Sequence, residues 1–141
     1  MCDLRRLREE HDELAVIGAH LSGIIAKNEP PPSQELYRIR MRLASGLIRH
    51  LKTEDWILYP ALLASSNERI AVTARAFSAS MGGLADDFRG YAGRWNAAAI
   101  ENDWSGYRRE TVEMLRVLTL RMNREERDLY PFLNSVGQAA A

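Results

Sequence analysis

An internal repeat constrains the fold of this chain more than any other feature of its sequence. When the second half is placed on the first with an offset of 71 residues, the stretch HLKTEDWILYPAL lies on RMNREERDLYPFL. Glu54 then falls on Glu125, and the Leu-Tyr-Pro that begins at Leu58 falls on the one that begins at Leu129. A carboxylate and a Leu-Tyr-Pro at one shared spacing indicate two supersecondary units built to one plan.

Both halves carry the periodicity of helices. Apolar residues recur at alternating steps of three and four, which is the spacing of one face of an α-helix. The composition agrees, because 17 Leu and 18 Ala against 5 Val, 8 Ile and 4 Thr favour helix over sheet. The apolar stripes run through residues 4–25, 36–61, 70–95 and 104–132. We therefore predict four long helices, with the pair Gly82-Gly83 inside the third.

Short breaks separate the four stripes, and this is typical of an antiparallel helix bundle. The chain has 141 residues, close to the commonest size of one domain, so two independent cores are not expected. We predict an all-α fold, a single up-down antiparallel four-helix bundle over residues 1–141, with hairpins at about 3–64 and 67–135. Pro60 and Pro131 lie inside helical stretches, and each should kink or end its helix locally.

Charge and cysteine content exclude several classes of protein. The 19 basic and 19 acidic residues cancel, so no net field would attract nucleic acid or an anionic membrane. No apolar run is long enough to span a bilayer, and the first residues are charged where a signal peptide is apolar. The single cysteine, Cys2, excludes an intramolecular disulfide and a cysteine-based zinc site. We expect a cytoplasmic protein that binds neither nucleic acid nor membrane, and leave open a protein partner or a homodimer.

Several polar residues lie on stripes that should face the core. His50 and Glu54 stand at i and i+4, so both project from one face of the second helix, and His11 lies on the inward stripe of the first. An imidazole nitrogen and a carboxylate oxygen at this spacing can share one metal ion, and imidazole suits iron or zinc. Taken singly, such residues are more often hydrogen-bonded core residues. Their coincidence with the repeat favours a metal site.

These residues follow the pattern of a known family. From about residue 8 to 133 the chain resembles the hemerythrin-like HHE cation-binding domains. The matching residues are His11, His50-x-x-x-Glu54-Asp55 and Tyr59-Pro60 in the first half, and Glu125-Glu126 and Tyr130-Pro131 in the second. Members of that family are four-helix bundles with a non-haem di-iron centre, and they bind or sense oxygen or nitric oxide, handle iron, or respond to oxidative stress. The resemblance implies metal ligands at His11, His50, Glu54 and Glu125.

The second half departs from the family pattern, which has a His and a His-x-x-x-Glu in each half. The two histidine positions are taken by Met81 and Arg121, and only Glu125 remains. A thioether is a poor partner for oxygen-binding iron, and a guanidinium stays protonated and has no lone pair to donate. Arg121 should instead neutralise Glu125 one turn on, and Glu54 across the bundle, in the place of a second metal.

Three states of the site then compete. Our first choice has no functional metal, with an Arg121–Glu125 ion pair in the core; the second has one ion of iron or zinc on His11, His50 and Glu54, with Glu125 as a further ligand. A full di-iron centre is the least favoured. We expect a domain with a degenerate di-metal site that acts as a binding, sensing or regulatory protein and not as an enzyme. The alternative is a mononuclear or remnant non-haem iron site that senses or handles oxygen, nitric oxide or peroxide; a structural helical adaptor is a third.

Overall fold

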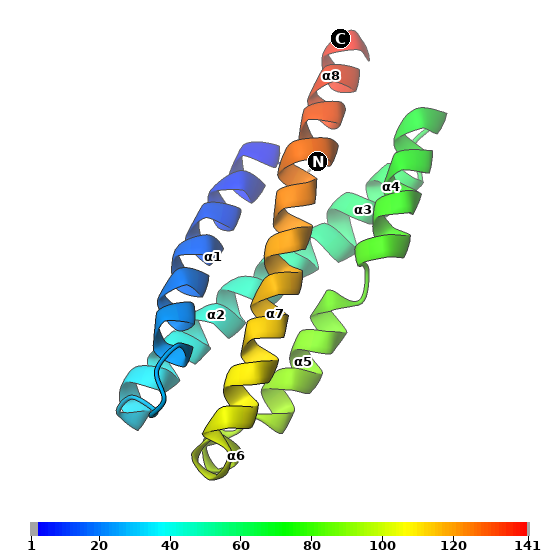
Figure 1. The fold of residues 1–141 in the computed structure, drawn as a ribbon. Coiled ribbons are helices and arrows are strands. Elements are labelled where there is room, and N and C mark those ends of the chain that lie inside the picture. The colour runs from blue at the N-terminus through cyan, green and yellow to red at the C-terminus, as the bar shows by residue number, and fades with distance from the viewer. Residues whose placement is uncertain (1–2, 141) are drawn as a thin grey trace.

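The computed structural model describes residues 3–140, so that Cys2 lies outside the described part. It has the predicted all-α fold, in which four helical rods lie side by side (Figure 1). The first rod is α1 (Leu4–Ile25), and the second consists of α2 (Ser33–Thr53), η1 (Glu54–Leu58) and α3 (Tyr59–Leu63). The third rod consists of α4 (Glu68–Met81) and α5 (Leu84–Arg94), and the short helix α6 (Ala97–Asn102) follows it. The fourth rod consists of α7 (Trp104–Arg124), η2 (Glu125–Leu129) and α8 (Tyr130–Ala140).

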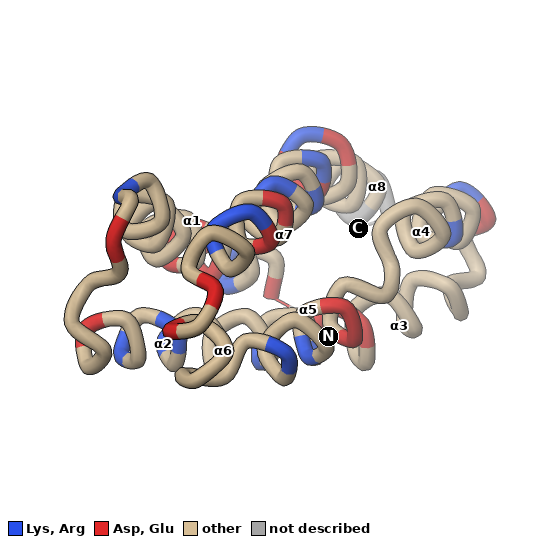
Figure 2. Tube along the Cα trace, turned by 60° about the horizontal axis from the view of Figure 1, so that its bottom comes forward, with Lys and Arg blue, Asp and Glu red and all other residues tan. Residues whose placement is uncertain are grey.

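The packing of the rods closes the bundle. Helix α1 contacts α2 and α7, and α5 contacts the same two helices from the other side. Basic and acidic residues are interspersed along the rods, as Figure 2 shows, in agreement with the balanced composition. None of the described helices is both long and apolar enough to cross a membrane.

Each proline of the repeat follows one π turn. In η1 the N–H of Tyr59 donates to the carbonyl of Glu54, five residues back, and in η2 the N–H of Tyr130 donates in the same way to Glu125. Pro60 has no N–H with which to continue the α-helical ladder, and the wider turn before it accommodates that loss. Pro60 thus lies in the first turn of α3, where a missing N–H costs little. Our alternative that the prolines end their helices is wrong.

The third rod is broken where the sequence predicted one continuous helix. Helix α4 ends at Met81 and α5 begins at Leu84. Gly83 has φ 86°, a left-handed conformation that glycine adopts without strain. A Cβ on Gly82 would lie 2.5 Å from the carbonyl oxygen of Ser78. The two glycines therefore interrupt the helix instead of lying inside it, and the last carbonyl groups of α4 are left without helical partners.

A polar layer separates two apolar clusters in the core. The larger cluster includes Leu14, Leu51 and Met122, and the smaller includes Leu7, Leu58 and Leu129. His11 stands between Leu7 and Leu14 in sequence, Glu54 between Leu51 and Leu58, and Glu125 between Met122 and Leu129. The inward polar residues thus form a layer across the bundle, between the two clusters.

Candidate metal centre

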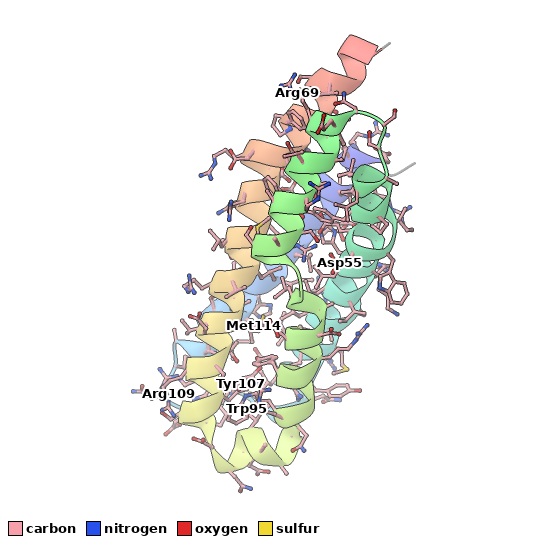
Figure 3. All side chains as sticks on the ribbon, turned by 90° about the vertical axis from the view of Figure 1, so that its right-hand side faces the viewer. Asp55, Arg69, Trp95, Tyr107, Arg109 and Met114 are labelled. Atoms are coloured by element: carbon pink, nitrogen blue, oxygen red, sulfur yellow. The ribbon has the colours of Figure 1, made fainter. Side chains whose placement is uncertain are left out.

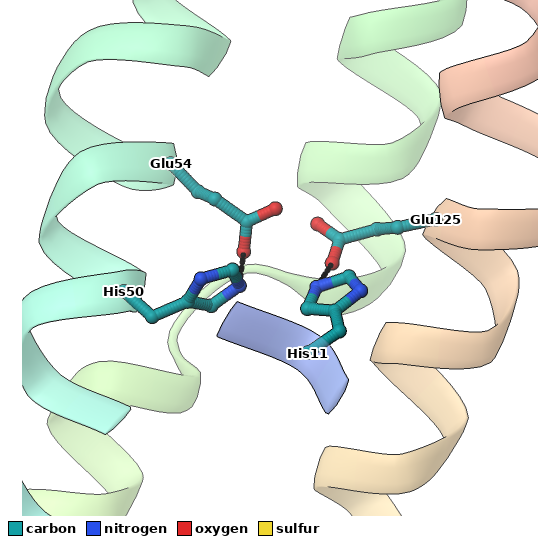
Figure 4. Close-up of side chains that lie close together, drawn as sticks. All are labelled: His11, His50, Glu54 and Glu125. Carbon is teal, nitrogen blue, oxygen red and sulfur yellow. Dashed lines mark ion pairs between the residues drawn. The ribbon is translucent and has the colours of Figure 1, made fainter. Parts of the chain in front are cut away.

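The structure brings the four residues predicted as metal ligands together. His11 comes from α1, His50 from α2, Glu54 from η1 and Glu125 from η2, and at most 4% of each side chain is exposed. One ligand atom of each lies within 4.8 Å of those of the other three. Figure 4 shows the two imidazoles and the two carboxylates facing a common centre.

The four candidate ligands form two pairs. His50 Nε2 lies 3.0 Å from Glu54 Oε1, and His11 Nε2 lies 3.2 Å from Glu125 Oε1 (Figure 4). Ligands that bind a metal at about 2.0–2.2 Å are separated from their neighbours by about 3.0–3.6 Å. Both pairs therefore have the spacing of adjacent ligands around one ion.

The other nitrogen of each imidazole is held by a carboxylate. Nδ1 of His11 lies 2.9 Å from Glu126 Oε1, and Nδ1 of His50 lies 2.7 Å from Glu10 Oε1. Such a partner fixes the proton on Nδ1, so that Nε2 presents its lone pair to the centre. The sequence placed Glu126 in the family pattern without a partner and Glu10 on a solvated surface, so neither contact with a histidine was predicted. Their positions next to His11 and Glu125 were the available signal.

The second oxygen of each buried carboxylate accepts a hydrogen bond from one tyrosine hydroxyl. The hydroxyl of Tyr130 donates to Glu54 Oε2 at 2.8 Å, and that of Tyr59 donates to Glu125 Oε2 at 2.8 Å. Each tyrosine comes from the half of the chain opposite to its carboxylate, so the two bonds cross between the hairpins. The repeat aligned these tyrosines, but sequence alone did not show which carboxylate each would meet.

Arg121 is buried beside the four ligands and makes more contacts than we predicted. Its Nη2 lies 2.7 Å from Asp55 Oδ1 and 3.3 Å from Glu54 Oε1, and its Nε lies 3.5 Å from Glu125 Oε2. The shortest of these contacts is to Asp55, which the sequence placed in the family pattern but not in contact with Arg121. Asp55 lies at mid-length of the bundle, beside the break between α4 and α5 (Figure 3).

Met81, the other departure from the family pattern, contributes its backbone to this region. Nη1 of Arg121 donates to the carbonyl oxygen of Met81 at 3.3 Å. The side chain of Met81 is half-buried and packs against the smaller apolar cluster. Arg121 and Met81 are thus in contact with each other, and neither offers a nitrogen lone pair or a carboxylate oxygen to a metal ion.

The two buried glutamates have opposite pKa shifts. Burial, followed by the negative charge of Glu54, raises the pKa of Glu125 above its ordinary value. Burial acts in the same direction on Glu54, but the contacts with His50 and Glu125 and the charge of Arg121 outweigh it and lower the pKa. Of the two carboxyl groups, Glu125 therefore keeps a proton to higher pH than Glu54. Metal binding releases such protons, because ligands bind in their deprotonated form.

The residues present fit one metal ion. Two imidazole nitrogens and two carboxylate oxygens are a donor set that suits iron or zinc. His50 Nε2 and Glu125 Oε1 are buried and have no hydrogen-bond partner, which calls for an explanation in a core where polar atoms are nearly always paired. A metal on these atoms would supply it. The positions in the second half do not fit a second ion, because Met81 and Arg121 provide no suitable donor.

The comparisons with known proteins agree with this geometry. The family model of the hemerythrin HHE cation binding domain matches residues 2–133, nearly the whole chain. No curated protein and no solved structure matches the chain. With an all-α bundle and a buried cluster of His and Glu side chains that could bind metal, the chain belongs to the hemerythrin HHE cation-binding domain family.

Proposed function

We propose that the protein holds one metal ion on His11, His50, Glu54 and Glu125 and acts as a binding or sensing domain, not as an enzyme. One observation carries this proposal: every ligand has one polar atom held by a neighbour and another that faces the common centre. Acids hold the two Nδ1 atoms, and tyrosine hydroxyls hold the two Oε2 atoms.

This observation favours the one-metal state over the metal-free state that the sequence favoured. An ion pair between Arg121 and the glutamates needs no particular orientation of the imidazoles. Fixed imidazoles whose Nε2 atoms face carboxylates at 3.0 and 3.2 Å are what a metal requires of its ligands. Without the ion, His50 Nε2 and Glu125 Oε1 are buried and have no hydrogen-bond partner, which lowers the free energy of unfolding.

The surroundings of the site support binding and sensing in preference to catalysis. The four ligand side chains are almost completely buried. A cleft of about 330 Å³ lies beside them and is lined by Asp55 and Tyr59, which contact Arg121 and Glu125, but by none of the four ligands themselves. An iron ion on the four ligands would supply redox chemistry and affinity for small diatomic ligands, as the resemblance to the hemerythrin-like domains implies. A signal would then pass to a protein partner or a second copy of the chain.

Metal analysis tests the proposal. Protein reconstituted with ferrous iron without oxygen should contain about one ion per chain, measured by elemental analysis after removal of unbound metal. The variant His11→Ala should lose the ion. His20→Ala is the matched control, because His20 lies on the same helix but is exposed. A parent protein that binds no iron or zinc, or equal metal contents in the two variants, would contradict the proposal.

A further inference from the structure

We infer that Arg121 is a resident cation in the place of a second metal, so that the domain binds one ion and folds without any. The first part deepens the proposed function and rests on it, whereas the second part concerns the metal-free protein alone. The argument starts from the internal repeat, which assigns every ligand of the first half an equivalent position in the second.

Arg121 occupies the position that corresponds to His50. In the first half His50 stands one turn before Glu54, and Nε2 lies 3.0 Å from Oε1. In the second half Arg121 stands one turn before Glu125, and its Nε lies 3.5 Å from Oε2. A cationic side chain therefore stands where the repeat would place a metal-binding imidazole.

Asp55 shows that the guanidinium also replaces the other missing histidine. Asp55 corresponds to Glu126 in the repeat, and Glu126 holds Nδ1 of His11. The residue that corresponds to His11 is Met81, whose side chain has no N–H to offer to Asp55. Instead, Nη2 of Arg121 donates a hydrogen bond to the Asp55 carboxylate at 2.7 Å. One side chain thus satisfies the acid that the absent imidazole would have bound.

The charges around Arg121 resemble those around a metal ion. Its guanidinium lies between the carboxylates of Glu54, Asp55 and Glu125, and it also donates to the Met81 carbonyl at the C-terminal end of α4. That end of a helix attracts cations. A guanidinium does not lose its proton in proteins, so this neutralisation is permanent. A second metal ion would meet a fixed positive charge at contact distance.

Two cations therefore have different roles in this site. The permanent cation, Arg121, neutralises the buried carboxylates in the metal-free protein, so that the protein folds without a metal. The exchangeable one binds on the side of the site formed by His11 and His50. Without Arg121, the buried glutamates would depend on metal for their neutralisation, because an unpaired buried charge is strongly destabilising.

The first test compares the thermal midpoints of metal-free proteins. Arg121→Gln should lower the midpoint by about 10 °C, and ferrous iron should raise the midpoint of this variant more than that of the parent. Arg116→Gln removes an exposed arginine from the same helix and should melt like the parent. Arg121→Lys, which keeps the charge, should lie closer to the parent. Equal midpoints for Arg121→Gln and the parent, or equal losses in the Gln and Lys variants, would overturn the inference.

The second test measures iron stoichiometry. The double variant Met81→His/Arg121→His supplies the two missing imidazoles and should bind about one ion more than the parent, whereas Met81→His alone should bind no more than the parent. A folded double variant, checked by circular dichroism, that binds no more iron than the parent would overturn the inference and leave the one-metal proposal standing. A parent that binds none refutes the one-metal proposal, and a gain in the double variant would still support the role of Arg121. If the double variant does not fold, the melting test decides.

Discussion

The two hairpins of this bundle have the same backbone plan but different chemistry. Each has one π turn followed by a Tyr-Pro, and each sends a glutamate into the polar layer. The first hairpin adds two histidines to its glutamate, whereas the second adds an arginine and a methionine at the corresponding positions. The scaffold around a site can thus persist when two of the six donors of the family pattern are replaced.

The difference teaches what the scaffold itself requires. A buried carboxylate needs a positive or hydrogen-bonding partner in every state of the protein, and either a metal with its ligands or a guanidinium can serve. Glu54 lies next to His50 and Arg121 at once, at 3.0 and 3.3 Å. Glu54 is therefore the carboxylate that contacts both the imidazole of the first hairpin and the guanidinium of the second.

The largest effect on stability should come from removing the buried guanidinium of Arg121 in the second hairpin. Arg121→Ala leaves three carboxylates without their cation, two of them fully buried, and should lower the free energy of unfolding of the metal-free protein by about 3–5 kcal/mol. Chemical denaturation measures this change, with the exposed Arg116→Ala as control. A loss below about 0.5 kcal/mol is the value of an exposed pair and would contradict the buried placement.

The crossed tyrosines offer a second comparison between the hairpins. Tyr130→Phe removes a hydrogen bond to Glu54, whose pKa is lowered, and should cost about 2 kcal/mol of the free energy of unfolding. Tyr59→Phe removes a hydrogen bond to Glu125, whose pKa is raised, and should cost about 1 kcal/mol. Denaturation of the two metal-free variants measures the difference. The reverse order would contradict the opposite pKa shifts of the two glutamates.

A backbone comparison tests the break in the third rod. Gly83→Ala places a side chain at φ 86° and should cost about 1–2 kcal/mol. Gly23→Ala lies in the unbroken α1, where an added Cβ meets nothing within 4 Å, and should stabilise by about 0.5–1 kcal/mol. If Gly83→Ala were also stabilising, the helix would run through this position as first predicted.

The smallest effect on stability should come from Asp55, which follows Glu54, and from Glu126, which follows Glu125. Asp55→Asn weakens the contact with Arg121, and Glu126→Gln weakens the contacts with His11 and Arg8. Both carboxylates are partly exposed, so each change should cost about 1 kcal/mol or less. Their effects on metal binding should differ. Glu126→Gln disturbs the partner of His11 and should weaken metal affinity at least tenfold, measured by competition with a chelator. Asp55→Asn, whose partner is Arg121, should leave the affinity nearly unchanged.

The sequence by itself determined the helices, their order and the residues of the polar layer. These properties are local or periodic: a stripe at steps of three and four marks the buried face of a helix, and His50 and Glu54 share a face because they are four residues apart. The repeat then carried the same assignment to Glu125 and Arg121. Sequence spacing also showed that the second half lacks two imidazoles.

Only the tertiary structure decided which atoms meet across the bundle. Tyr130 holds Glu54, Glu10 holds His50, and Arg121 prefers Asp55, and each of these contacts joins residues from different rods. The break at Gly83 likewise depends on backbone angles that a helical stripe does not reveal. The physical reason is that spacing along one helix fixes neighbours on that helix alone. The partners of a long side chain on another rod follow from how the rods pack and which rotamers then fit.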